Sequence, residues 1–135
     1  MDPTDDPDLK TFDDAINYRN LAAVERLARS GADLNERNQI DATPLISACS
    51  SGQFRIAESL IAAGADVFAH DRFGMTAGLL AWNSRVAEKS VEGAARERVI
   101  AQMRAQGFPF PPPSAEDVRE ALARGAWPPV KGTAS

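Results

Sequence analysis

Apolar positions near the middle of the chain recur at the spacing of one helix face: Phe54, Ile56, Ala57, Leu60 and Ile61. Gly52 precedes this run and Gly64 follows it, and glycine often ends a helix because it adopts the left-handed conformation without strain. Upstream, Thr43 can cap a helix and Pro44 suits its first position, where a missing N–H costs nothing. The pattern therefore predicts one short helix over 44–51 and a second between the two glycines.

The same pattern repeats along the chain at a fixed interval. Gly31-Ala32-Asp33 returns as Gly64-Ala65-Asp66, and Thr43-Pro44-Leu45 is in register with Thr76-Ala77-Gly78 at the same step. A period of about 33 residues is typical of stacked helical repeats, in which each unit buries its apolar face only against its neighbours.

The middle unit resembles the ankyrin repeat family. The resemblance is carried by the Thr-Pro-Leu start at 43–45, Gly52 between the helices, the aliphatic pair Leu60-Ile61 and the closing Gly-Ala-Asp at 64–66. Ile46 stands where the family commonly has histidine. The resemblance implies an all-α solenoid of about three helix-loop-helix repeats, with loop tips projecting from one edge and a concave face for binding.

The predicted organisation is an acidic N-terminal tail (1–7), repeats over 8–107 (8–40, 41–73 and 74–107), a proline-rich connector (108–113) and a C-terminal capping helix with its tail (114–135). Thr11 with Asp14 predicts the first helix start. The third repeat is irregular: the stretch from Thr76 to Gly107 is much longer than the equivalent stretch from Thr43 to Gly64, which indicates an insertion near 85–95.

The proline-rich connector cannot be helical, and it is expected to be pinned to the stack by Phe108 and Phe110. Recognition of its prolines by an aromatic groove of another domain is the alternative. Ser114 with Asp117 predicts the start of a last helix, 114–124, that covers the end of the stack.

Charge is concentrated at one end of the 135-residue chain, which has a net charge of −4. Residues 1–14 hold six aspartates against Lys10, and the remainder is nearly balanced, so no basic patch predicts nucleic-acid binding. The chain has no apolar run long enough to span a bilayer and no secretory signal pattern, which favours a cytoplasmic protein that does not bind membranes.

Catalytic chemistry has two candidates in the sequence, Cys49 and His70, each the only residue of its type. Cys49 is predicted inside a helix at a packing position, and His70 in a loop between repeats. No metal-ligand spacing or phosphate-binding glycine loop is present, so neither metal nor cofactor is expected. A small enzyme using Cys49 or His70 is the weaker alternative to a non-catalytic role.

Binding is expected at the loop tips and along the inner helices. At the tips, Arg37, Gln39, Ile40, Arg72, Phe73 and Met75 combine apolar side chains with arginine, a mixture enriched in binding hot spots. Ile40 and Phe73 could instead fold back on the neighbouring loop. Along the inner helices the candidates are Ser50, Trp82 and Asn83; Trp82 either fills space in the irregular repeat or is an exposed anchor.

The sequence thus predicts a non-catalytic protein-binding module that docks a folded partner on its concave face. Adaptor, inhibitor and immunity-type roles are all compatible with this prediction, and the unbound chain is expected to be a monomer. A self-assembling structural repeat unit is the third alternative. The charged insertion near 85–95 is either a helical extension or part of the binding face.

Overall fold

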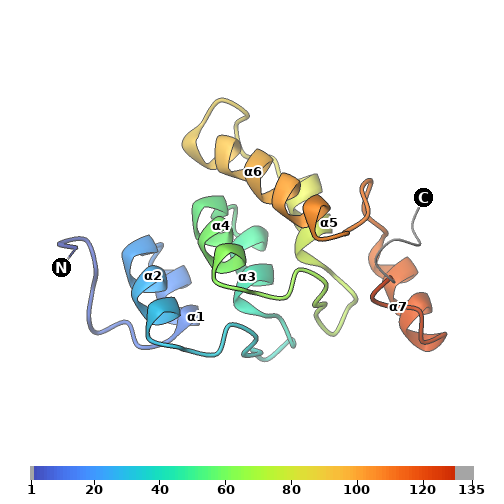
Figure 1. Ribbon diagram of the computed structural model, residues 1–135, viewed down its shortest axis with the longest axis horizontal. Coiled ribbons are helices and arrows are strands. Elements are labelled where there is room, and N and C mark those ends of the chain that lie inside the picture. The colour runs from blue at the N-terminus through green and yellow to red at the C-terminus, as the bar shows by residue number, and fades with distance from the viewer. Residues whose placement is uncertain (1, 130–135) are drawn as a thin grey trace.

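The computed structural model describes residues 2–129, a part of the chain that forms seven helices (Figure 1). They are α1 (Phe12–Asn17), α2 (Leu21–Arg29), α3 (Pro44–Ser50), α4 (Phe54–Ala62), α5 (Ala77–Asn83), α6 (Val91–Ala105) and α7 (Ala115–Ala123). Within residues 2–129 the only strand-like pairing is one antiparallel bridge between His70 and Thr76. Met1 and residues 130–135, the outer parts of the two predicted tails, lie outside the described residues.

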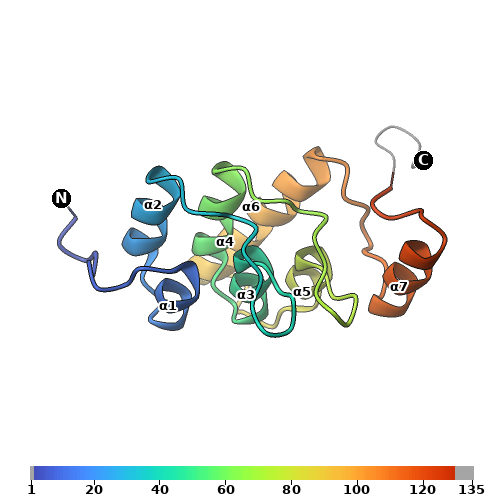
Figure 2. The same ribbon diagram turned by 90° about the horizontal axis from the view of Figure 1, so that it is seen from below.

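The first six helices form three pairs that stack side by side. Each pair is antiparallel, α1, α3 and α5 make one layer, and α2, α4 and α6 make the other (Figure 2). A fully buried alanine recurs at the same position of each inner helix, at Ala15, Ala48 and Ala81, which lets these helices approach closely. The all-α repeat solenoid predicted from the repeat period is confirmed.

The helix starts follow the capping residues found in the sequence. The side-chain oxygens of Thr11, Thr43 and Thr76 accept hydrogen bonds from the third following backbone N–H at 3.1, 3.4 and 3.1 Å. Such caps satisfy an N–H that would otherwise lack a partner in the first turn. Ser114 and Asp117 form the predicted reciprocal capping box at the start of α7.

The third helix pair differs from the other two in the length of its second helix. α6 has 15 residues, whereas α2 and α4 have nine each. The extra residues expected near 85–95 lie in the connection before α6 and in its first turns. Glu92, in the first turn of α6, accepts hydrogen bonds from the backbone N–H of Arg55 at 2.9 Å and from its guanidinium at 3.2 Å. The extension therefore contacts the start of α4.

Aromatic side chains cover the last face of the stack. Phe108 is buried against Gly78 of α5, where an added Cβ would stand 2.4 Å from the ring. Its centroid lies 5.6 Å from that of Phe68, 5.3 Å from Phe110 and 5.9 Å from Trp127. The expectation that Phe108 and Phe110 pin the connector is confirmed.

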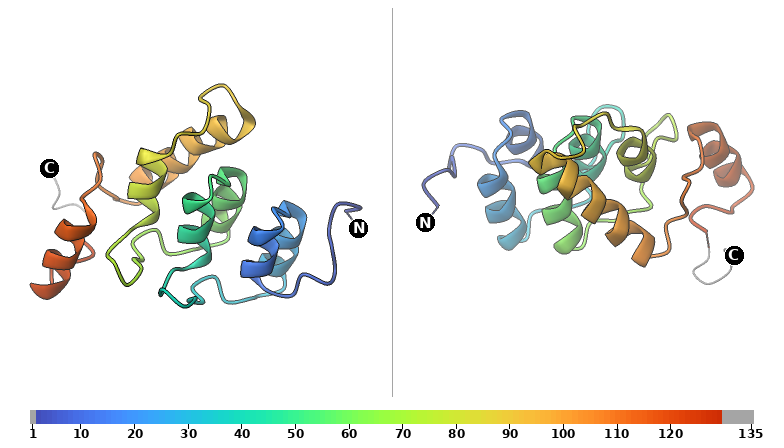
Figure 3. Two further views of the ribbon diagram at one scale, coloured as in Figure 1. Left: turned by 180° about the vertical axis from the view of Figure 1, so that it is seen from behind. Right: turned by 90° about the horizontal axis from the view of Figure 1, so that it is seen from above.

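Helix α7 stands beyond the α5–α6 pair, beside the loop that precedes α5 (Figure 3). Val118 is its one buried residue. The Arg119 guanidinium donates to the carbonyl oxygen of Phe73, and the Trp127 indole N–H donates to that of Phe68 at 2.9 Å. The end of the stack is thus covered mainly by the aromatic residues that flank α7, and α7 itself contacts the loop.

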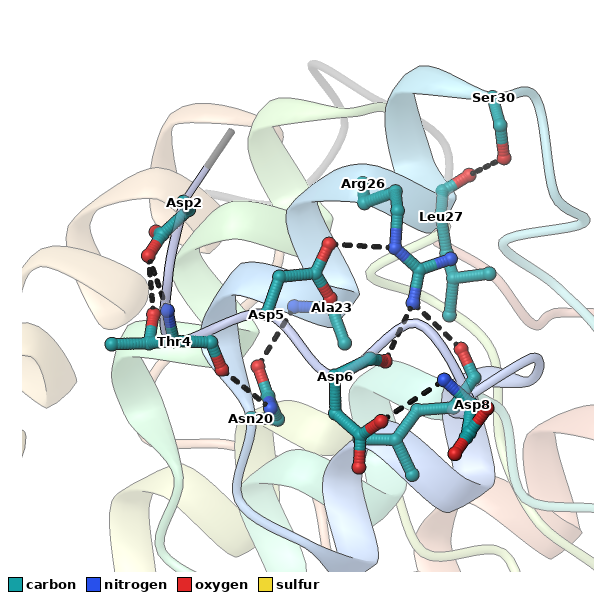
Figure 4. Close-up of polar contacts among 11 residues, drawn as sticks. Asp2, Thr4, Asp5, Asp6, Asp8, Asn20, Ala23, Arg26, Leu27 and Ser30 are labelled. Carbon is teal, nitrogen blue, oxygen red and sulfur yellow. Dashed lines mark hydrogen bonds and ion pairs between the residues drawn. The ribbon is translucent and has the colours of Figure 1, made fainter.

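At the other end of the stack, the acidic segment 2–9 is attached to α2 (Figure 4). The Arg26 guanidinium donates to the Asp5 carboxylate at 2.7 Å and to the carbonyl oxygens of Asp6 and Leu9 at 3.1 and 2.8 Å. The Asn20 side-chain amide donates to the carbonyl oxygen of Thr4 at 2.9 Å. The N-terminal segment, which the sequence indicated only as a tail, therefore covers part of the first helix pair.

Candidate functional site

A groove of about 330 Å³ lies where the loop tips meet the inner helices. Its walls come from the first loop tip (residues 38–42), the second loop tip (residues 71–75), α3 and α5. The lining residues are Ile40, Ala42, Ile46, Ser47, Ser50, Asp71, Met75 and Leu80. We call this feature the inner groove. It brings together three of the predicted binding residues, Ile40, Ser50 and Met75.

Two arginines predicted to contact a partner, Arg37 and Arg72, join the two loop tips to one another. Arg72 donates its backbone N–H to the carbonyl oxygen of Ile40 at 2.9 Å and its guanidinium to that of Gln39. The Arg37 guanidinium donates to the carbonyl oxygens of Asp41 and His70, both at 2.7 Å. These bonds hold the two tips as one rigid edge, so Arg37 and Arg72 have a structural role whether or not they touch a partner.

Local backbone geometry also fixes the tips. Asp41 has φ +62° and the equivalent Gly74 has φ +86°, so both tips have the left-handed conformation at this position. A side chain at residue 74 would in addition strike the carbonyl oxygen of Ala115, 2.5 Å from the added Cβ. The left-handed conformation is adopted by an aspartate in the first tip, so it is the approach of α7 that makes glycine necessary at the second tip.

The apolar side chains of the tips remain accessible. Ile40 is 41% exposed and Phe73 is 52% exposed, so neither folds back into the neighbouring loop. Ile40 lines the inner groove, whereas Phe73 is not part of its lining and lies next to α7. Gln39 is exposed beside Ile40.

Two predicted residues lie away from the groove, at the end of α5. Trp82 is 41% exposed and its ring centroid is 5.7 Å from that of Phe110. The Arg96 guanidinium donates to its carbonyl oxygen at 2.8 Å. Part of the Trp82 ring thus packs on the connector, as expected if it fills space in the irregular repeat. The rest of the ring remains exposed, as expected if it is an anchor for a partner. Asn83 is exposed.

Five residues that build the groove are not among those predicted from the sequence: Ala42, Ile46, Ser47, Asp71 and Leu80. The sequence singles out Ile46 only as the replacement of a family histidine. The repeat register is the sequence feature from which these residues could be predicted. Ser47 and Leu80 occupy equivalent positions of successive repeats in the inner layer, and Asn38 and Asp71 occupy equivalent positions of the two tips.

The two residues considered for catalysis lie in environments typical of structural residues. Cys49 is buried in α3, and burial raises the pKa of its thiol to about 12, so the reactive thiolate is scarce near neutral pH. The main chain of His70 pairs with Thr76, and its Nδ1 lies 2.9 Å from the carbonyl oxygen of Asp71. Neither residue lines the inner groove.

Among residues 2–129, no cluster of three or more histidine, cysteine, aspartate or glutamate side chains could hold a metal ion. Within the same residues, every helix is too short or too polar to cross a lipid bilayer.

Partial relatives of the chain are found among characterised proteins. It is 40% identical over 53 residues to alpha-latrotoxin-Lg1a of Latrodectus geometricus, a match that covers 39% of this chain and 4% of that protein. It is 41% identical over 58 residues to protein phosphatase 1 regulatory subunit 27 of Homo sapiens and of Mus musculus, covering 43% of this chain and 38% of each relative. The chain thus matches well under half the length of these relatives.

The family model described as ankyrin repeats, in three copies, matches residues 12–89. This range contains the first two helix pairs, α5 and both loop tips. The resemblance seen in the sequence is therefore confirmed, and ankyrin repeats indicate a protein-binding module. The chain belongs to the ankyrin repeat family.

Proposed function

We propose that the chain is a non-catalytic module that docks a folded partner protein on its concave face and loop tips, as an adaptor or an inhibitor. The observation that carries the proposal is the inner groove, a preformed hollow with apolar walls beside the exposed side chain of Ile40. Covering such apolar surface is favourable, at about 25 cal/mol per Å² removed from water.

The rigidity of the tips supports the same function. The bonds from Arg37 and Arg72 hold the groove walls in place before any partner arrives. A surface ordered in advance loses less conformational entropy on binding, and more of the interaction free energy remains as affinity. Outside the groove lining, Gln39 and Phe73 at the loop tips and Trp82 and Asn83 at the end of α5 are further candidates for partner contact.

One relative fits a regulatory role. Protein phosphatase 1 regulatory subunit 27 is, by its name, a subunit that regulates an enzyme rather than an enzyme itself. A similar role here, with the partner's activity inhibited or redirected, suits a chain whose Cys49 and His70 both lie outside the groove. Cytoplasmic location and the absence of nucleic-acid and membrane partners remain part of the proposal.

The ends of the stack favour a monomer over a self-assembling unit. The segment 2–9 lies on α2, and the aromatic residues around Phe108 cover the α5–α6 pair. Repeat stacks associate through uncovered terminal faces, and these contacts reduce the apolar area available for that association.

Partner capture with matched variants tests the proposal. We expect Ser50→Arg, which places a long charged side chain in the inner groove, to reduce capture from the native lysate at least about tenfold, the loss typical of a disrupted hot spot. Ala62→Arg makes the same addition at an exposed position near the end of α4, outside the groove lining, and is expected to leave capture unchanged.

Both variants should retain the helical circular dichroism and melting temperature of the wild type, since both positions are exposed. Equal capture by wild type and Ser50→Arg would contradict the proposal. We prefer Ser50 to Arg72 for this test because removing Arg72 would also break its bond to the first tip.

A further inference from the structure

Asp71 places a buried carboxylate at the wall of the inner groove. The residue is 5% exposed, and its Oδ1 accepts hydrogen bonds from the backbone N–H groups of Phe73 at 2.8 Å and Met75 at 3.0 Å. These bonds close the second loop tip. Among the described residues nothing donates to Oδ2, and that oxygen is not one of the fully enclosed unpaired atoms. Asp71 lines the inner groove, and within residues 2–129 its second carboxylate oxygen has no hydrogen-bond donor.

The first loop tip shows that this turn does not require a charge. Asn38 occupies the position equivalent to Asp71, and its side-chain oxygen accepts from the backbone N–H groups of Ile40 and Ala42, both at 3.0 Å. The two tips therefore use the same pair of hydrogen bonds, one with a neutral amide and one with a carboxylate. The negative charge of Asp71 is an addition to what folding of the tip needs.

No ion pair neutralises this charge within residues 2–129. The ion pairs found there join Arg26 to Asp5, Arg55 to Glu92 and Arg98 to Glu58. The arginines nearest in the loops, Arg37 and Arg72, direct their guanidinium groups at main-chain carbonyl oxygens. A buried carboxylate without a cation is costly, and a cation supplied by a ligand would relieve that cost.

The remainder of the groove is suited to aliphatic groups. Five of its eight lining residues are apolar: Ile40, Ala42, Ile46, Met75 and Leu80. Its volume of about 330 Å³ is near the lower end for small-molecule pockets, so it accepts a short segment rather than a whole helix. A lysine or arginine has the matching shape, because its methylene stem can lie on apolar surface while its charged end reaches an acidic group.

We infer that the inner groove binds a surface segment of the partner in which an aliphatic side chain is adjacent to a lysine or arginine, with the cation bonded to Oδ2 of Asp71. The inference rests on the proposed function, and it adds the chemistry of the partner segment. An acidic or uncharged segment would lack the group that completes the site.

Three blocked pentapeptides test the inference, each with a central leucine followed by lysine, norleucine or glutamate. Titration of the ¹⁵N-labelled full chain, followed by NMR, gives both the dissociation constant and the location of binding. We expect the lysine peptide to shift the amide signals of Ile40, Met75 and Leu80. It should bind about tenfold more tightly than the norleucine peptide, as expected for one charge-assisted hydrogen bond.

Asp71→Asn should remove the preference for lysine while leaving norleucine binding unchanged. This variant is expected to fold, because Asn38 already serves the same turn. Asp66→Asn is the matched control: Asp66 also accepts a backbone N–H, from Phe68 at 2.8 Å, but it is exposed and outside the groove. The control should retain the full preference for lysine.

Three results would overturn the inference: no shift of groove signals by the lysine peptide, equal affinity for the three peptides, or the same loss in Asp71→Asn and Asp66→Asn. The proposed function is judged separately by Ser50→Arg. Loss of partner capture in that variant, together with any of these results, would leave the groove as the binding site and remove only the cationic segment.

Discussion

Replacing Phe108 with alanine is expected to lower the free energy of unfolding by about 3–5 kcal/mol, the range found for buried phenylalanines. The ring is 2% exposed and touches aromatic residues that precede and follow it in the chain. Its removal leaves a cavity over Gly78 and loosens the contact of the connector with the stack. Urea denaturation followed by circular dichroism measures the change.

Leu122→Ala is the matched control for this prediction. Leu122 is an apolar residue of the same C-terminal region, but it is 37% exposed on α7. Its loss should cost less than that of Phe108, because Leu122 is smaller and keeps more than a third of its surface in water in the folded chain. Equal effects of the two substitutions would show that the aromatic residues do not hold the end of the stack.

Leu60→Ala is expected to destabilise the chain by about 2–5 kcal/mol. Leu60 is fully buried in α4, and α4 packs against α2, α3 and α6, one helix from each pair. A cavity there weakens both interfaces of the middle repeat. Since repeats are stable only through their neighbours, we expect a single unfolding transition at lower denaturant concentration rather than loss of one repeat.

Glu58→Ala in the same helix provides the comparison for Leu60. Glu58 accepts two hydrogen bonds from the Arg98 guanidinium, at 2.6 and 3.1 Å. Arg98 is nonetheless exposed and Glu58 partly exposed to solvent, and such surface pairs contribute only about 0–1 kcal/mol. A larger loss of stability from Glu58→Ala than from Leu60→Ala would contradict this prediction. It would mean that surface ion pairs, and not buried apolar contacts, hold α2, α4 and α6 together.

The helix boundaries could be predicted because they depend on neighbouring residues. Thr43 and Thr76 cap their helices through bonds to N–H groups less than one turn away, and Ser114 does the same. Asp41 aligns with Gly74 at the repeat period, and both residues have the left-handed conformation. In each case the sequence within one turn determines the geometry, and the repeat period supplies the register.

The groove was only partly predictable because its walls come from four separate elements. Ile40 and Met75 were expected as tip residues, but Leu80 and Asp71 acquire a role only when α5 and the second tip are placed beside α3. The different uses of Arg37 and Arg72 show the same limit. Arginine beside apolar tip residues suggested hot spots, and nothing local shows that Arg37 bonds the carbonyl oxygen of His70 or that Arg72 bonds that of Gln39, 33 residues away in each case.

The N-terminal contacts were not predicted for a related reason. The aspartates of segment 2–8 indicated a charged tail, and nothing local shows that Arg26, in the second helix, bonds Asp5 and two carbonyl oxygens. Long-range polar contacts of this kind depend on how the chain returns past α2, which sequence periodicity does not describe.

Photo-crosslinking at single positions tests the central claim, that a partner is bound in the inner groove. A benzophenone amino acid at residue 50 lies in the groove, and the same group at residue 62 lies outside its lining. Irradiation in the native lysate is expected to yield a discrete protein adduct from position 50 and none from position 62. An adduct from position 62 alone, or no adduct from either position, would contradict the account.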